Sequence, residues 1–265
     1  MAVTLSQTPP LLREHEGPAV EVINDDGNSR IVLICEHASL QFPEALGTLG
    51  LDLEARESHI AWDPGARVVA DHLSQALDAP LVAARFSRLA FDCNRPPGRS
   101  GVAEQSERWT IPGNQGLDDA QIAQRVQSIY EPFHQHLAAL LETRLANGPA
   151  PILVSIHSFT PVFNGERRDL ELGILHDADS RLADALLPLS PAVTGLDTRR
   201  NQPYEPRDGV THTMRTHALA QGLANVMLEI RSDLIERLDL AERVAHRLAK
   251  LLQAGLTALL KHPAS

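Results

Sequence analysis

The stretch Ile152-Leu153-Val154-Ser155-Ile156-His157-Ser158-Phe159 decides the fold class of this 265-residue chain. Apolar and β-branched residues run into a histidine that is followed by small and apolar residues. This pattern predicts a buried strand that presents His157 at its carboxyl end. In open α/β sheets, ligands bind in the crevice outside the carboxyl ends of the strands. We therefore expect His157 to face a functional crevice.

Two further segments have the same form. The apolar run at 31–35 leads into Glu36 and His37, and the run at 226–228 leads into Glu229 and Arg231. Three buried strands that end in histidine or glutamate indicate a metal-centred hydrolytic site.

Outward from these strands, apolar runs alternate with amphipathic segments. We expect strands at 31–35, 81–84, 89–91, 152–157, 171–175 and 226–230, and helices at 65–77, 118–147, 179–187, 212–222 and 239–260. The 118–147 helix is either continuous or broken near Pro132. Alternating strands and helices predict an α/β protein. We expect an irregular N-terminal arm at 1–29 and then a single three-layer domain at 30–265. Its mixed, largely parallel sheet would be flanked by helices.

The composition excludes several classes of partner. With 34 acidic and 24 basic residues, the formal net charge is −10, so nucleic acid and anionic membranes are not expected partners. No apolar run approaches the roughly 20 residues that span a bilayer, and we see no signal peptide. Cys35 and Cys93 are expected to be buried free thiols. We expect a cytoplasmic protein.

The two strand-end histidines are the first candidates for chemistry. A catalytic zinc site uses three protein ligands, often nitrogen and carboxylate oxygen, plus water. His37 and His157 would supply two ligands, and the third is either Asp63 or Glu36. Alternatively, Asp63 caps the following helix, and Glu36 orients a histidine from outside the ligand set.

Other residues suit substrate binding. Asn94 and Arg95 follow a predicted strand, and an arginine fork binds a carboxylate through two parallel hydrogen bonds. The alternative is a turn residue beside a surface arginine. Tyr204, on a loop, would donate a hydrogen bond to substrate or only pack its ring. His212 is a minor candidate for substrate contact.

Glu229 is the candidate general base. A glutamate beside a metal-bound water would remove a proton that the metal has already acidified. Arg231 lies two residues further along the same strand, so both side chains face one side. The alternative is that Glu229 and Arg231 only pair with each other and hold the strand end.

In this order, these segments resemble the zinc carboxypeptidase superfamily and, more closely, the N-formylglutamate amidohydrolase family, over about residues 30–250. The motifs that carry the closer resemblance are Cys35-Glu36-His37-Ala38-Ser39, His59-Ile60-Ala61-Trp62-Asp63-Pro64-Gly65-Ala66, Ser87-Arg88-Leu89, Asp92-Cys93-Asn94-Arg95-Pro96, Ile111-Pro112-Gly113-Asn114, His157-Ser158-Phe159-Thr160-Pro161 and Glu229-Ile230-Arg231-Ser232-Asp233-Leu234. Position 40 is leucine, so the His-x-x-Glu zinc motif of the carboxypeptidases is missing. Asp63 matches an acidic position of the closer family and is our preferred third ligand.

The resemblance implies a zinc-dependent amidohydrolase that converts N-formylglutamate to glutamate and formate, as in histidine degradation. Its substrate would be a small anionic N-acyl amino acid. Arg95 would bind one substrate carboxylate, and Arg88 or Arg85 a second, with Asn94, Tyr204 and Arg231 as further contacts. The alternatives are a deacylase or carboxypeptidase with another substrate, and a non-catalytic protein that binds a metal or a small anion.

Overall fold

The computed structural model describes residues 10–261. Seven strands form one sheet in the order β1-β3-β2-β6-β11-β9-β10. They are β1 (Val20–Ile23), β2 (Ile31–Cys35), β3 (Leu81–Ala84), β6 (Ile152–Phe159), β9 (Leu172–Leu175), β10 (Thr198–Arg200) and β11 (Asn225–Arg231). The four central strands are parallel, while β1 runs antiparallel to β3 and β9 runs antiparallel to β11.

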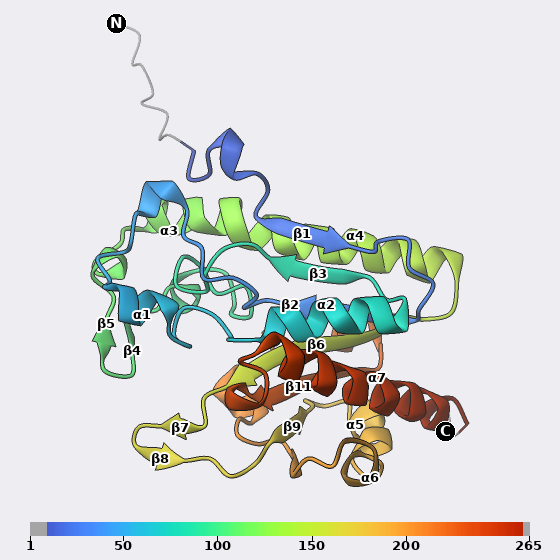
Figure 1. Cartoon of the computed structure of the whole chain (residues 1–265). Helices are drawn as coiled ribbons and strands as arrows, with labels where there is room; N and C mark the ends of the chain where they lie inside the picture. The colour runs from blue at the N-terminus through green and yellow to red at the C-terminus, as the bar shows by residue number, and fades with distance from the viewer. Residues whose placement is uncertain (1–9, 262–265) are drawn as a thin grey trace, which may run out of the picture.

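Helices cover both faces of the sheet. In Figure 1, α2 and α7 cross in front of the central strands, and α4 runs behind β1 and β3. The α-helices are α1 (Leu53–Glu57), α2 (Ala66–Leu77), α3 (Asp119–Arg125), α4 (Glu131–Asn147), α5 (Arg181–Leu186), α6 (Ser190–Thr194) and α7 (Leu238–Lys261). This arrangement confirms the predicted three-layer α/β domain with a mixed, largely parallel sheet.

Short elements complete the chain. Two small hairpins are formed by β4 (Gln105–Ser106) with β5 (Trp109–Thr110), and by β7 (Val162–Phe163) with β8 (Glu166–Arg167). The 3-10 turns are η1 (Glu14–Glu16), η2 (Glu44–Leu46), η3 (Arg99–Gly101), η4 (Pro112–Asn114), η6 (Pro206–Asp208), η8 (Leu219–Gln221) and η9 (Ser232–Leu234), and the π-helical turns are η5 (Val126–Tyr130) and η7 (Met214–Ala218).

The central strand β6 shows why this sequence forms a three-layer core. All eight of its residues are buried. Successive side chains point to opposite faces of a strand. Ile152, Val154 and Ile156 accordingly pack into the cluster beneath α2, α5 and α7, and Leu153 packs into the cluster beneath α4. A strand buried on both faces needs an almost continuous apolar run, which is the pattern that identified it.

The structure differs from the expected secondary structure at four places. Residues 1–29 were expected to be irregular, yet Val20–Ile23 forms the edge strand β1. The expected strand at 89–91 is a turn instead, because the Ser87 hydroxyl accepts a hydrogen bond from the Leu89 backbone N–H and donates to the Ala61 carbonyl. The expected loop at 197–210 contains β10, and the expected helix at 212–222 is a π turn followed by a 3-10 turn.

The segment 118–147, expected as one long helix or as a helix broken near Pro132, is interrupted close to that residue. The π turn η5 separates α3 from α4, and Pro132 follows it in the first turn of α4. Proline has no N–H to donate along a helix, which accounts for a disturbed turn at this point. In the described part of the chain, no helix is both long and apolar enough to cross a membrane.

Candidate metal centre and its cavity

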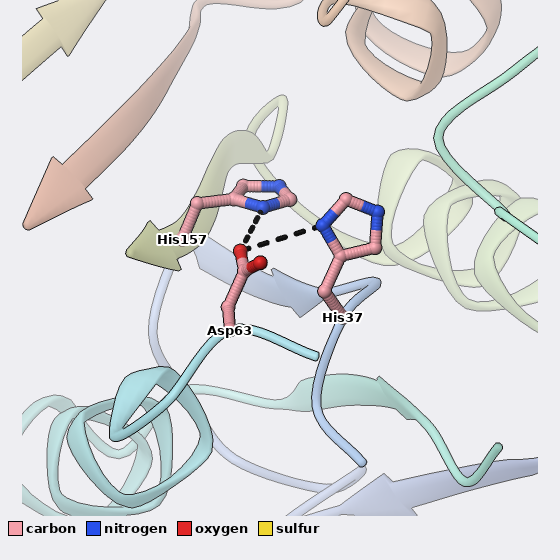
Figure 2. A group of neighbouring side chains, drawn as sticks. All are labelled: His37, Asp63 and His157. Atoms are coloured by element: carbon pink, nitrogen blue, oxygen red, sulfur yellow. Dashed lines mark hydrogen bonds and ion pairs between the residues drawn. The ribbon is translucent and has the colours of Figure 1, made fainter. Parts of the chain in front are cut away.

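Three buried side chains from different elements meet at the carboxyl ends of the parallel strands. His37 follows β2, His157 lies in β6, and Asp63 lies in the loop before α2. Their candidate ligand atoms all lie within 4.8 Å of one another. Figure 2 shows the Asp63 carboxylate between the two rings, with Oδ2 at 2.7 Å from His157 Nδ1 and 3.4 Å from His37 Nδ1.

A carboxylate also lies beside the far nitrogen of each histidine. His37 Nε2 lies 2.8 Å from Asp92 Oδ1, and His157 Nε2 lies 3.1 Å from Glu36 Oε2. Carboxylates at this position fix the ring orientation and strengthen a metal-ligating histidine. Both Nδ1 atoms are thereby directed toward Asp63. The residues present fit a zinc ion, because two imidazole nitrogens and one carboxylate oxygen form a three-ligand set.

The third-ligand alternatives are separated in space. Asp63 belongs to the group, whereas Glu36 contacts Ser155 Oγ at 2.7 Å and His157 on its far side. Gly65, two residues after Asp63, shapes the turn that leads into α2. It has φ +79°, and a Cβ there would lie 2.4 Å from the Ile235 carbonyl oxygen. Only glycine adopts this conformation at so close an approach.

The charges of the group support one another. Burial favours the neutral forms of all these side chains. For Glu36 this is outweighed by the neighbouring His157, which lowers the pKa of Glu36 to about 2. His37 and His157 likewise hold the pKa of Asp63 below its usual range. Conversely, Glu36 and Asp63 raise the pKa of His157 despite its burial. The negative charges of Glu36 and Asp63 and a positive charge on the neighbouring imidazole therefore stabilise one another.

Glu229 lies directly beside this group. It is the cross-strand partner of His157 in the β11–β6 register and is only 4% exposed. Its Oε2 atom is buried without a hydrogen-bond partner. Burial raises the pKa of Glu229 to about 7, although attraction to His157 opposes the shift. A carboxylate with a pKa near neutrality suits a group that accepts and then returns a proton.

Arg231 does not share the cavity with Glu229, contrary to the expectation from their alternation. Its guanidinium donates to Asp233 Oδ1 at 2.8 Å and to the Asp169 carbonyl at 2.8 Å. No ion pair joins Arg231 to Glu229 in residues 10–261, and Arg231 does not line the cavity. The 168–171 segment lies at the end of β11 and its backbone carbonyls accept hydrogen bonds from Arg231, so this arginine holds the segment in place.

The cavity above the metal group has a volume of about 330 Å³. Its polar lining residues are His37, His59, Asp63, Arg88, Asp92, Asn94, Arg95, Ser100, Ser106, Glu107, His157, Ser158, Tyr204, Asp208 and Glu229. The structure therefore brings together His37, Asp63, His157 and Glu229 with Arg88, Arg95 and Tyr204. His212 and Arg85 do not line it: His212 contacts the Tyr130 hydroxyl, and Arg85 donates to the Pro18 carbonyl.

Asn94 lines the cavity, but both ends of its amide are engaged within the protein. Its nitrogen donates to the Val210 carbonyl at 2.6 Å, and its oxygen accepts from the Thr213 backbone N–H at 3.1 Å. One N–H of the amide is left to donate to a substrate, so the expected contact stays a prediction. Asn94 also fixes the 210–213 segment against the cavity.

The two cavity arginines have different partners. Arg88 donates to Asp92 Oδ2 at 2.9 Å and lies 3.5 Å from Asp63 Oδ1. Arg95 donates to the backbone carbonyls of Asn94 and Gly209 at 3.0 and 2.9 Å. Arg88 is therefore paired directly with carboxylates, whereas Arg95 forms no ion pair within residues 10–261, although it lies close enough to Asp92 to help lower the pKa of that carboxyl.

Tyr204 reaches the cavity from a loop that crosses β9 closely. A Cβ on Gly173 would lie 2.0 Å from the Gln202 carbonyl oxygen, so a side chain there would displace the loop. The Tyr204 hydroxyl accepts a hydrogen bond from Arg168 Nη1 at 3.2 Å. As a result, its proton remains free to be donated into the cavity.

Sequence reasoning missed Asp92, His59, Glu107 and Asp208. Asp92 belongs to the same motif as Asn94 and Arg95. It directly follows an apolar run, and this position is the signal in the sequence that marks it. His59 and Glu107 are 48 residues apart, and their contact is tertiary, with His59 Nε2 at 2.5 Å from Glu107 Oε1. No local pattern marks Glu107 or Asp208.

Comparison with known proteins agrees with this geometry. The sequence profile described as N-formylglutamate amidohydrolase matches residues 29–236. No curated protein sequence matches the chain.

The chain is also similar to solved structures, among them the following two. The gene product Atu2144 of Agrobacterium tumefaciens is 47% identical with a TM-score of 0.92, and the match covers 94% of this chain and 99% of that one. The N-formylglutamate amidohydrolase of Ralstonia eutropha JMP134 is 15% identical with a TM-score of 0.68, covering 92% and 98%, and shows a shared fold. From the extent of the profile match, the chain belongs to the N-formylglutamate amidohydrolase family.

Proposed function

We propose that this protein is a metal-dependent amidohydrolase that cleaves the amide bond of a small N-acyl amino acid. The leading substrate, suggested by the family, is N-formylglutamate, with glutamate and formate as products. One observation carries the proposal: a His-Asp-His group and a partnerless buried glutamate face the same cavity. We expect it to act in the cytoplasm on a free metabolite.

The metal would be zinc or another divalent ion, held by His37, Asp63 and His157. When bound, such an ion polarises a carbonyl oxygen and lowers the pKa of a water molecule. Asp92 and Glu36 would keep the two imidazole rings in the orientation that this requires.

The protein's own residues would carry the proton and orient the substrate. Glu229 would take the proton of the attacking water at its partnerless Oε2 and pass it to the nitrogen of the leaving amine. Its raised pKa suits both halves of that transfer. Arg95 would bind the α-carboxylate of the substrate, and Tyr204 would donate a hydrogen bond from its hydroxyl.

A second candidate is hydrolysis of a different N-acyl amino acid or of a peptide C-terminus. It is favoured by the pairing of Arg88 with Asp63 and Asp92, which leaves one cavity arginine for the two carboxylates of N-formylglutamate. A non-catalytic metal- or anion-binding protein is the third. It would have no use for a buried glutamate with a pKa near neutrality beside the metal group.

A hydrolysis screen on zinc-loaded protein tests the proposal. N-formyl, N-acetyl and N-succinyl derivatives of several amino acids would be assayed for release of the free amine. We expect turnover of at least one N-acyl series and loss of turnover with a chelator. Stoichiometric metal binding without any turnover would contradict an enzyme and favour the non-catalytic alternative.

A further inference from the structure

One wall of the cavity is formed by a histidine and a glutamate that lie outside the metal group. His59 lies between α1 and α2, and Glu107 lies in the turn between β4 and β5. Both line the cavity, and His59 Nε2 lies 2.5 Å from Glu107 Oε1. Their side chains are 28% and 17% exposed, so a ligand that fills the cavity meets them.

The arrangement presents a hydrogen-bond acceptor to the cavity. The contact with His59 uses one carboxylate oxygen of Glu107 and leaves the other, Oε2, to accept a hydrogen bond. The Glu107 carboxylate lies directly against the His59 ring, so the pair has no excess positive charge to offer a ligand. A substrate carboxylate at this wall would therefore find no cation to bind.

The charges of the whole cavity lead to the same conclusion. Its lining within residues 10–261 includes five carboxylates, from Asp63, Asp92, Glu107, Asp208 and Glu229, and two guanidinium groups, from Arg88 and Arg95. Arg88 is paired with two of the acids. Arg95 suffices for one carboxylate of a substrate, and a second carboxylate would find no further guanidinium that is free of an acidic partner.

We propose that the His59–Glu107 pair selects the substrate side chain, and that it favours a hydrogen-bond-donating side chain, such as an amide or an ammonium group, over a carboxylate. This inference rests on the proposed function, an amidohydrolase of N-acyl amino acids, and departs from its leading substrate only in the side chain. N-formylglutamine, which has the length of N-formylglutamate but donates at its end, would be the better substrate.

The test is the ratio of kcat/KM for N-formyl-L-glutamine to that for N-formyl-L-glutamate, measured on zinc-loaded protein. Juxtaposed like charges cost several kcal/mol, and 1.4 kcal/mol is a factor of ten, so we expect a wild-type ratio of at least about 10. Glu107→Gln keeps an oxygen for His59 and removes the negative charge, so it should bring the ratio close to equality. His59→Gln leaves the carboxylate in place, so the ratio should not fall.

Glu104→Gln is the matched control. Glu104 is exposed in the same segment and does not line the cavity, so this variant should keep the wild-type ratio. A wild-type preference for the glutamate derivative would overturn the inference. So would equal shifts in the ratio for Glu107→Gln and Glu104→Gln.

Failure of the proposed function is distinguishable from failure of this inference. If neither these two compounds nor any other N-acyl amino acid of the hydrolysis screen is hydrolysed, the amidohydrolase proposal fails. The ratio of the two dissociation constants, measured by calorimetry on wild type and Glu107→Gln, then tests the selection by itself. Absence of binding by both compounds, or tighter binding of the glutamate derivative, would overturn it.

Discussion

Two pairs of buried histidines in this molecule have opposite electrostatics. The His37 and His157 rings are 4.7 Å apart and nearly perpendicular, and carboxylates face their nitrogens. The His134 and His217 rings are 5.0 Å apart and stacked. In this second pair the two rings bond to each other at 2.7 Å, and His134 Nε2 donates to the Cys93 carbonyl at 2.9 Å.

The difference shows that burial alone does not make a metal site. Burial lowers the pKa of both His134 and His217 to about 4, so these rings are neutral at pH 7. At His157 the acids Glu36 and Asp63 outweigh burial and raise the pKa. An environment that stabilises positive charge on a ring also stabilises a cation placed between the rings. Of these two pairs, His37 and His157 have such an environment, because carboxylates surround them.

The largest expected effect is on metal content. A substitution in the first pair should remove the metal, whereas a substitution in the second pair should not. His157→Gln should abolish bound metal, whereas His217→Gln should leave it near stoichiometric, because His217 contacts no residue of the metal group. Elemental analysis of protein purified without chelator measures both. If the two variants bind equal amounts of metal, the distinction between the pairs is wrong.

Next in size is the role of Glu229. Glu229→Gln is nearly isosteric and cannot accept a proton, so kcat should fall by about 10²–10⁴-fold while metal content is unchanged. Because no ion pair to Arg231 is lost, the melting temperature should not decrease. A less stable variant with wild-type kcat would show that Glu229 is structural.

A smaller effect should follow from removing the outer carboxylates. Glu36→Gln and Asp92→Asn keep the shape of each side chain but remove the charge that faces a histidine Nε2. Such partners typically contribute about 10–100-fold to metal affinity. A competition titration with a zinc chelator measures this change. Unchanged affinity in both variants would mean that the outer carboxylates, Glu36 and Asp92, do not contribute to metal binding by the first pair.

The convergence of His37, His157 and Glu229 was predictable because each ends or follows an apolar run. Parallel strands bring their carboxyl ends to one edge, so a one-dimensional pattern contains this three-dimensional information. The three-layer fold was predictable for the same reason. The preference for Asp63 over Glu36 came from the family resemblance and not from this pattern, because it depends on which side of the His157 ring each carboxylate lies.

Contacts between loops account for what the sequence did not reveal. Arg231 alternates with Glu229 but is captured by carbonyls of the 168–171 segment, and Asn94 is used to hold the 210–213 segment. The edge strand Val20–Ile23 is too short to stand out from its polar surroundings. His134 and His217 pair across 83 residues, and neither lies at the end of an apolar run.

The smallest expected effect, on stability against pH, separates the two pairs directly. His134 and His217 have pKa values of about 4 in the fold against about 6.5 in an unfolded chain. Between these values the unfolded chain binds more protons than the native protein. Their contribution to the free energy of unfolding is therefore fully present above pH 6.5 and is lost as the pH falls toward 4, at up to about 1.4 kcal/mol per pH unit for each histidine.

The pKa values of His157 and Glu229 are raised, so at these two groups the native protein binds more protons than the unfolded chain. Their contribution to the free energy of unfolding therefore changes with pH in the opposite direction. The difference between variants therefore gives the clearest measurement. Urea unfolding of wild type and His217→Gln at pH 7, 6 and 5 should show a shallower loss of stability in the variant. His246→Gln, which removes an exposed histidine on α7, should keep the wild-type slope. Equal slopes in all three proteins would mean that the stacked pair is not held neutral, and the contrast with the metal pair would disappear.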